Sequence, residues 1–180
     1  LRLKYCSSCY HCQLSHSVSP DIFFKNYKYV SGTSITGKQF FKENSEFIHK
    51  YKGKVGKILD IACNDGSQLN PFKDLGWETF GVDPAENIAK KANDKLINTI
   101  PKFFNYNTAK EIVSKYGEYD ICIARNVLAH VNELHSLAEG IRLIIKDDGF
   151  AVIEVPSLYA MVEELQYDQV FHEHIGYHSL

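Results

Sequence analysis

The sequence lacks the long apolar run that a membrane-spanning helix needs, and it lacks the charged-then-apolar leader of a signal peptide. It also lacks a dense block of Lys and Arg, since twenty basic residues stand against twenty-two acidic ones and give a formal charge of -2. A nucleic-acid-binding surface would need such a block. We therefore expect no membrane or nucleic-acid partner, and a cytoplasmic location.

The five cysteines are odd in number, so they cannot all pair in disulfides. Cys63 and Cys122 also lie inside apolar segments, and this usage is typical of a reducing compartment. Cys6 and Cys9 have the C-x-x-C spacing of half a tetrahedral zinc site, which Cys12 is poorly spaced to complete. A thioredoxin-like redox pair is disfavoured, because no βαβ pattern surrounds these cysteines.

What the sequence does contain is enough apolar surface for one folded domain with a small attachment. Hydrophobic residues make up 44% of its 180 positions and charged residues 23%, close to the averages for soluble globular chains. Residues 1–16 alternate apolar and polar side chains around the cysteines, which predicts a small hairpin. Residues 38–52 repeat apolar side chains on one face, which predicts a linking helix.

From Lys57 onward, strand patterns alternate with helix patterns. Strands are predicted at 57–63, 77–83, 119–124 and 150–156, and helices at 68–76, 84–94, 108–117 and 132–145. The stretch 97–106 has no clear pattern. This alternation predicts an α/β fold, a doubly wound and mostly parallel sheet with helices on both faces and a small Cys-containing N-terminal piece.

The turn after the first predicted strand is where such a sheet binds its ligand. A dinucleotide-binding dehydrogenase would need G-x-G-x-x-G there, and only Gly66 is available. Asp60 ends the first strand, and Asp83 ends the second, where it can accept hydrogen bonds from the two hydroxyls of a ribose. The arrangement favours S-adenosylmethionine over a nicotinamide cofactor.

Several segments resemble the class I methyltransferases, and among them the sugar C-methyltransferases that act on nucleotide-linked deoxysugars. The resemblance covers the whole chain and rests on C-x-x-C followed by QL at 13–14, YKY at 27–29 with SGTS at 31–34, LDIACNDGSQL at 59–69, ARNVLAHV at 124–131, IEVP at 153–156 and FHEHIGYHS at 171–179. The segments ARNVLAHV and FHEHIGYHS are the specific ones, because the nucleotide turn is shared with many methyltransferases.

The resemblance implies S-adenosylmethionine as cofactor and a nucleotide-sugar as the small-molecule substrate. The residues expected at the cofactor are Asp60, Ala62, Asn64, Gly66, Gln68, Asp83, Pro84, Arg125 and Asn126. Substrate contacts are expected from Tyr27, Tyr29 and His130. His130 shares a helical face with Asn126 if that turn is helical. A histidine that is hydrogen-bonded within the core is an equally weighted alternative for it. The catalytic group is expected to comprise His174, Glu173, His172 and Tyr177.

The HEH triplet at 172–174 has a rival meaning as a metal cluster. Zinc hydrolases place two His at i and i+4 on a helix, whereas His172 and His174 are two apart and point to opposite sides of an extended segment. Methylation of carbon requires loss of a proton, and a His with a pKa of about 6.5 suits that task. The resemblance assigns the base to His174, with Glu173 orienting or acidifying a neighbour.

Two residues depart from that family's pattern. Ala62 stands where Gly is usual, and its methyl group fits if the backbone there has negative φ. Phe171 stands where a Tyr commonly precedes the triplet, so a phenol hydroxyl is missing. The family also has a cysteine pair ahead of Cys6 and a second α/β domain beyond Leu180. The chain is therefore expected to be part of a longer protein, and zinc is expected only in that intact protein.

The expected organisation is a remnant of a zinc-binding, substrate-capping domain over 1–35, a linking helix over 36–56, a cofactor-binding methyltransferase domain over 57–156 and the start of a substrate region over 157–180. The expected reaction is carbon methylation of a keto-deoxysugar through a His-assisted enolate. Two alternatives stay open: an O- or N-methyltransferase with the same cofactor turn, and a non-catalytic cofactor-binding fragment.

Overall fold

A five-stranded sheet forms the centre of the computed structural model, which describes residues 1–179. Its order is β5-β4-β3-β6-β7, and every neighbouring pair is parallel. The strands are β3 (Lys57–Ile61), β4 (Glu78–Val82), β5 (Asn98–Ile100), β6 (Tyr119–Arg125) and β7 (Ile145–Glu154). The chain steps outward from β3 in one direction and then from β6 in the other. This reversal creates the switch point at which open α/β sheets bind ligands.

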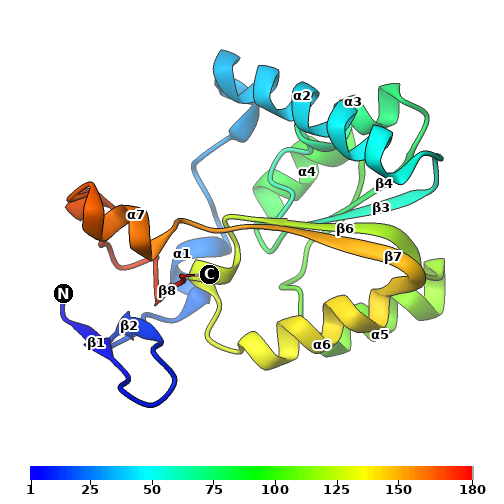
Figure 1. Ribbon diagram of the computed structural model, residues 1–180. Coiled ribbons are helices and arrows are strands. Elements are labelled where there is room, and N and C mark those ends of the chain that lie inside the picture. Colours follow the sequence, from blue (N-terminus) through cyan, green and yellow to red (C-terminus); the bar gives the residue numbers. More distant parts are fainter. Residues whose placement is uncertain (180) are drawn as a thin grey trace.

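Helices cover both faces of this sheet (Figure 1). On one face lie α2 (Ile35–Lys52), α3 (Leu69–Asp74) and α4 (Glu86–Asp94), and on the other lie α5 (Tyr106–Tyr116) and α6 (Leu134–Ile144). The right-handed crossovers expected of parallel strands place successive helices in this way.

Local signals set the ends of the longer helices. Ser34 Oγ accepts a hydrogen bond from the Gly37 amide at the start of α2, and Gly53 ends that helix with φ 75°. Asn105 Oδ1 accepts one from the Thr108 amide at the start of α5. These caps satisfy amide groups that a helix leaves free in its first turn.

Two apolar cores follow from the two covered faces. Leu59 of β3 packs in one core with Ile112 and Ile141 of the helices α5 and α6. Its neighbour Ile58 faces the opposite way and packs with Phe72 in the core beneath α2, α3 and α4. Adjacent residues of a strand point to opposite faces, so a strand that is covered on both sides is apolar throughout.

A second, three-stranded antiparallel sheet joins the two ends of the chain. It consists of β1 (Leu3–Tyr5), β2 (Cys12–Leu14) and β8 (Gly176–Tyr177) in that order. Its small core contains Cys12, Leu14 and Tyr177 together with Met161 of α7 (Leu158–Glu163). The segment that follows the main sheet therefore folds back onto the N-terminal hairpin (Figure 1).

The predicted α/β class with a parallel sheet is confirmed, as is the predicted hairpin within residues 1–16. Two details differ from the prediction. The unpatterned stretch 97–106 contains the strand β5. Strand β7 begins at Ile145 rather than at Phe150 because Ile145 pairs with Tyr119 ahead of a register shift in the ladder with β6. Among residues 1–179, no helix is both long and apolar enough to cross a membrane.

Candidate active site

A cavity of about 780 Å³ opens at the carboxyl ends of β3, β4 and β6. It collects most of the side chains that the sequence singles out for cofactor and substrate. Those in its wall are Tyr27, Tyr29, Asp60, Ala62, Asn64, Gln68, Asp83, Pro84, Arg125, Asn126 and His130. The cavity therefore spans both the nucleotide turn and the segment that follows β6.

The turn after β3 is held in a left-handed backbone conformation at three places. Ala62 has φ 55°, Asn64 has φ 52° and Gly66 has φ 73°. Ala62 was expected to fit if its φ were negative, and that condition is not met. Its backbone instead has a left-handed conformation, which costs about 1–2 kcal/mol for an L-residue. A Cβ at Gly66 would lie 3.0 Å from the Ile97 side chain, so this close approach and the positive φ both favour glycine there.

Asp83, at the end of β4, is fixed by two backbone amides. Its Oδ2 accepts from the Asn64 amide at 2.9 Å, and its Oδ1 accepts from the Ala85 amide at 2.9 Å. Burial raises the pKa of Asp83, and the two amides oppose that rise. The carboxylate is thus held in one orientation at the cavity wall, with lone pairs left for ligand hydroxyls.

Asp60 is buried at the end of β3, with 4% of its surface exposed. Burial raises the pKa of Asp60 to about 8, Arg125 opposes the rise, and Asp83 adds to it. At neutral pH this carboxyl group is therefore largely protonated. A positively charged ligand in the cavity would favour its ionised form.

Arg125, at the end of β6, has its guanidinium group held by contacts with three other side chains. Its guanidinium lies 4.4 Å from the ring centroid of Phe40, its Nη2 donates to Asn44 Oδ1 at 3.0 Å, and its Nε lies 3.1 Å from Glu154 Oε2. The next residue, Asn126, has φ 53°, so residues 126–130 do not form one helix. The shared helical face proposed for Asn126 and His130 is therefore wrong, although both line the cavity.

His130 brings an imidazole ring to the far side of the cavity, at the end of the short helix η2 (Leu128–His130). Its Nδ1 lies 2.8 Å from the backbone oxygen of Glu173. A carbonyl oxygen only accepts hydrogen bonds, so Nδ1 is the donor, and in the neutral ring the lone pair is on Nε2. A neutral His130 can therefore accept a proton at Nε2.

His174 packs directly behind His130, with 4.9 Å between the ring centroids. Its Nδ1 is 3.1 Å from the backbone oxygen of Gln169, and its ring lies 4.0 Å from that of Phe171. Burial lowers the pKa of His174, and His130 lowers it further. His174 is thus neutral at pH 7.

Tyr27 connects this histidine pair to the N-terminal segment. Its hydroxyl lies 3.5 Å from Glu173 Oε2, and its ring is 5.7 Å from that of Phe24, which in turn meets His130 edge-on at 5.5 Å. Burial raises the pKa of Tyr27 to about 12, and Glu173 adds to the effect. The phenol therefore stays protonated and can donate a hydrogen bond.

Comparison with known proteins places the chain in a family. Residues 36–180 match the family model described as a methyltransferase domain. The chain belongs to the methyltransferase domain family. Its parallel sheet with a cavity at the strand ends is the architecture of class I, S-adenosylmethionine-dependent methyltransferase domains.

Individual relatives agree with this assignment. The methyltransferase is 30% identical over 182 residues to the C-methyltransferase NovU of Streptomyces niveus, a match that covers 100% of this chain and 43% of that protein. It is 28% identical over 114 residues to a ubiquinone biosynthesis O-methyltransferase of Rhodopseudomonas palustris, covering 63% and 44%. A crystal structure of a SAM-dependent methyltransferase from Archaeoglobus fulgidus superimposes with a TM-score of 0.57 at 25% identity, covering 69% and 57%. The chain thus spans less than half the length of these two curated relatives.

The residues that line the cavity fit S-adenosylmethionine as the cofactor. Asp83 presents an oriented carboxylate to the cavity, and the buried Gln68 Nε2 there has no hydrogen-bond partner within residues 1–179. A buried donor without a partner costs free energy, so a ligand acceptor would relieve it.

Five residues expected at the site lie outside the cavity wall. Gly66 shapes the turn from behind, and Glu173 and His174 form a layer behind Tyr27 and His130. His172 is exposed, and Tyr177 is buried in β8. The catalytic roles of the last four stay predictions. Of these four, Glu173 and His174 contact the cavity residues Tyr27 and His130.

Cys6 and Cys9 are exposed in the turn between β1 and β2. The backbone amide of Cys9 lowers the pKa of the Cys6 thiol. Throughout the described part of the chain, no three or more His, Cys, Asp or Glu residues come together as a metal cluster, and Cys12 is buried in the small sheet core. Two thiols do not fit a closed tetrahedral zinc site.

Sequence reasoning missed an aromatic part of the wall. Phe103 and Phe104 enter the cavity after β5, and Phe24 and Phe40 enter from helices α1 (Pro20–Phe24) and α2. Recognition of β5 would have identified the first two, because residues that follow a parallel strand line the same edge of the sheet. The other two depend on how the N-terminal helices pack.

Proposed function

We propose that this methyltransferase transfers a methyl group to a carbon of a keto-deoxysugar linked to a nucleotide. The observation that carries the proposal is that one cavity reaches from the fixed carboxylate of Asp83 to the basic ring of His130. The likeness of the whole chain to a protein named as a C-methyltransferase supports it. When bound, S-adenosylmethionine supplies an electrophilic methyl group on sulfonium.

At the cofactor end, Asp83 would accept hydrogen bonds from ribose hydroxyls, because both its oxygens are already oriented by the amides of Asn64 and Ala85. Gln68 would donate from its unpaired Nε2. Arg125, stacked and ion-paired, would support the wall rather than move into the ligand.

At the acceptor end, the carbon next to the ketone must lose a proton before it can attack a methyl group. We assign that proton to the pair of His130 and His174. His130 is the member of the pair that lines the cavity, so its Nε2 would be the accepting atom. The C–H electron pair moves onto the ketone oxygen as an enolate. The Tyr27 hydroxyl would stabilise that oxygen by redirecting to it the one hydrogen bond that it otherwise donates to Glu173 Oε2. The carbon then forms its bond to methyl as the methyl–sulfur bond breaks, and the proton remains on imidazole.

The test is the position of the transferred methyl group. The protein is incubated with ¹³C-methyl S-adenosylmethionine and a 4-keto nucleotide-sugar, and the product is examined by NMR. A ¹³C methyl group bonded to a ring carbon is expected. A methyl group recovered on oxygen or nitrogen would contradict the proposal.

A second candidate is O-methylation of a small molecule, supported by the 28% identity to a ubiquinone biosynthesis O-methyltransferase. It needs no strong base for a carbon acid. Solvent exchange separates the two candidates: in D₂O without cofactor, only a carbon methyltransferase should catalyse exchange of the proton next to the ketone.

A further inference from the structure

Residues 27–33, here called the strap, cross from the N-terminal segment to the cofactor loops. The strap carries Tyr27 and Tyr29 into the cavity wall and ends in the short helix η1 (Ser31–Thr33). It does not belong to the main sheet. Two asparagine side chains hold it, one from the loop after β3 and one from the first turn of α4.

Asn87, in the first turn of α4, pairs with the backbone of Tyr27 in both directions. Its Oδ1 accepts from the Tyr27 amide at 3.2 Å, and its Nδ2 donates to the Tyr27 carbonyl at 2.8 Å. The Asn87 side chain thus pairs with the backbone of Tyr27 through two hydrogen bonds, as a residue of a neighbouring strand would. Asn87 itself is exposed, so nothing in the core requires an amide there.

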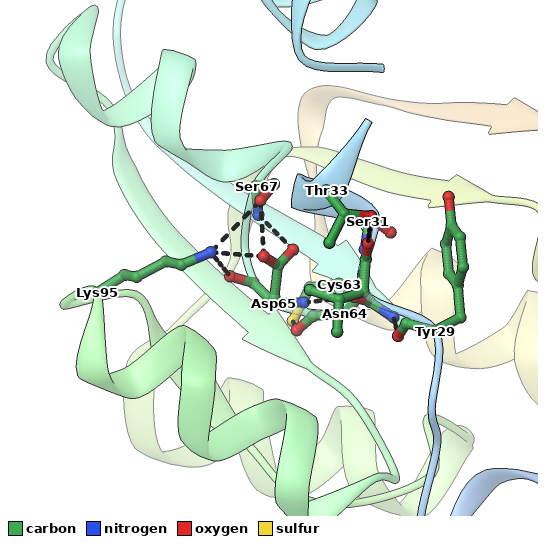
Figure 2. A network of polar contacts seen from close by, with 9 residues as sticks. Tyr29, Ser31, Thr33, Cys63, Asn64, Asp65, Ser67 and Lys95 are labelled. Atoms are coloured by element: carbon green, nitrogen blue, oxygen red, sulfur yellow. Dashed lines mark hydrogen bonds and ion pairs between the residues drawn. The ribbon is translucent and has the colours of Figure 1, made fainter. Parts of the chain in front are cut away.

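Asn64 makes a similar pair of hydrogen bonds to the strap backbone, two and four residues after Tyr27 (Figure 2). Its Oδ1 accepts from the Ser31 amide at 2.9 Å, and its Nδ2 donates to the Tyr29 carbonyl at 3.1 Å. The backbone amide of the same residue donates to Asp83 Oδ2 at 2.9 Å. Asn64 therefore contacts the strap and the proposed ribose carboxylate at once.

The strap also lies close against the turn itself. A Cβ at Gly32 would overlap Ser67 Oγ and lie 2.6 Å from Asp65 Oδ2. The Lys95 ammonium group forms an ion pair with that carboxylate, and its Nζ also donates a hydrogen bond to the Asp65 carbonyl at 3.1 Å (Figure 2). Gly32 of the strap therefore packs against a carboxylate that an ion pair with Lys95 holds in place.

We infer that Asn64 and Asn87 are positioning residues that tie the strap to the cofactor loops, so that a ligand at Asp83 fixes Tyr27 and Tyr29 in place for the acceptor. The inference rests on the proposed function. Its physical basis is that the strap cannot leave without breaking the Asn64 contacts, and Asn64 is held by the same carboxylate that would bind the ribose.

Amide hydrogen exchange followed by NMR reads this coupling directly, because the Tyr27 and Ser31 amides donate to the two asparagines. S-Adenosylhomocysteine is the probe, at ten times its dissociation constant. If the strap opens only when the cofactor site is empty, exchange at both amides slows about tenfold. A residue that only stabilised the fold would give no ligand-dependent change there.

Two variants separate positioning from folding. Asn64→Gly removes the amide while keeping the left-handed backbone, and Asn87→Ala removes an exposed side chain. Each should speed exchange at the strap and reduce the ligand effect to less than about twofold. Asn93→Ala is the matched control, because Asn93 lies in the same helix and its amide clamps Thr99 of β5 instead. It should keep the full tenfold effect.

A second readout is the ionisation of Tyr27, followed by ¹³C-tyrosine NMR. In Asn87→Ala the pKa of Tyr27 should fall from about 12 toward its ordinary value, because the phenol is no longer kept buried and beside Glu173. Ligand binding without any change in strap exchange would overturn the inference while leaving the proposed function intact. Absence of ligand binding would overturn both.

Discussion

The two ends of the cavity are built in different ways. The cofactor end comes from the ends of two adjacent strands, where Asp83 accepts hydrogen bonds from the amides of Ala85, two residues away, and Asn64, 19 residues away. The acceptor end joins Tyr27 to Glu173, which are 146 residues apart, and His130 to Glu173, which are 43 apart. One end is thus a local motif, and the other exists only once the small sheet has brought the chain termini together.

This difference predicts that the two functions can be separated by mutation. His130→Gln should reduce methyl transfer by about 10²–10⁴, the usual contribution of a positioned base, with the affinity for S-adenosylhomocysteine changed little. His174→Gln is its matched partner, and the variant with the larger loss of solvent exchange next to the ketone identifies the proton acceptor. Equal exchange in both variants and the parent would contradict the proposed histidine pair.

The opposite separation is expected from the cofactor end. Asp83→Ala removes two charge-assisted hydrogen bonds of about 1.5–3 kcal/mol each, so the affinity for S-adenosylhomocysteine should fall about hundredfold or more. Asp83→Asn, which keeps one acceptor oxygen and the side-chain size, should lose less. Calorimetry measures both, and unchanged affinity in the alanine variant would remove Asp83 from the site.

These two ends also differ in what the sequence could predict. The alternation after Lys57 predicted the sheet, and the acidic strand ends at Asp60 and Asp83 predicted the position of the cavity, because such features depend on neighbours in the chain. The pairing of β8 with β2 could not be predicted, since a two-residue strand has no periodicity to read.

The relative positions of the histidines were equally out of reach. The sequence predicted two functional segments, around His130 and around His174, but not that one ring would line the cavity with the other packed behind it. Nor does composition reveal the sign of φ at Ala62. Both depend on tertiary packing, which a pattern along the chain does not encode.

A proton-linkage measurement sharpens the comparison, because the buried acid Asp60 belongs to the cofactor end alone. The charged groups that act on it are Arg125 and Asp83. With a pKa of about 8, Asp60 is mostly protonated at pH 7, and a cationic ligand should lower that pKa and release about 0.5–1 proton.

Calorimetry at pH 7 in two buffers of different ionisation enthalpy measures that release. It should be larger for S-adenosylmethionine than for S-adenosylhomocysteine, because the former carries the additional sulfonium charge. Asp60→Asn, which cannot titrate, should abolish it. Release that persists in this variant would assign the proton elsewhere.

The smallest expected effect concerns the strained turn. Ala62→Gly should stabilise the protein by about 0.5–1 kcal/mol, because relief of the left-handed conformation exceeds the entropic cost of glycine. Ala151→Gly, at an exposed position of strand β7, is the control and should destabilise by a similar amount. Urea unfolding gives both values, and the same sign for the two variants would contradict the strain at Ala62.

The central claim is that the cofactor occupies the cavity at Asp83, and an NMR titration of the ¹⁵N-labelled protein with S-adenosylhomocysteine tests it most directly. The amides of Asn64 and Ala85, which donate to Asp83, should show the largest shifts. Smaller shifts should reach Tyr27 and His130 at the acceptor end. Shifts confined to the small sheet, or no saturable shifts at all, would contradict the account.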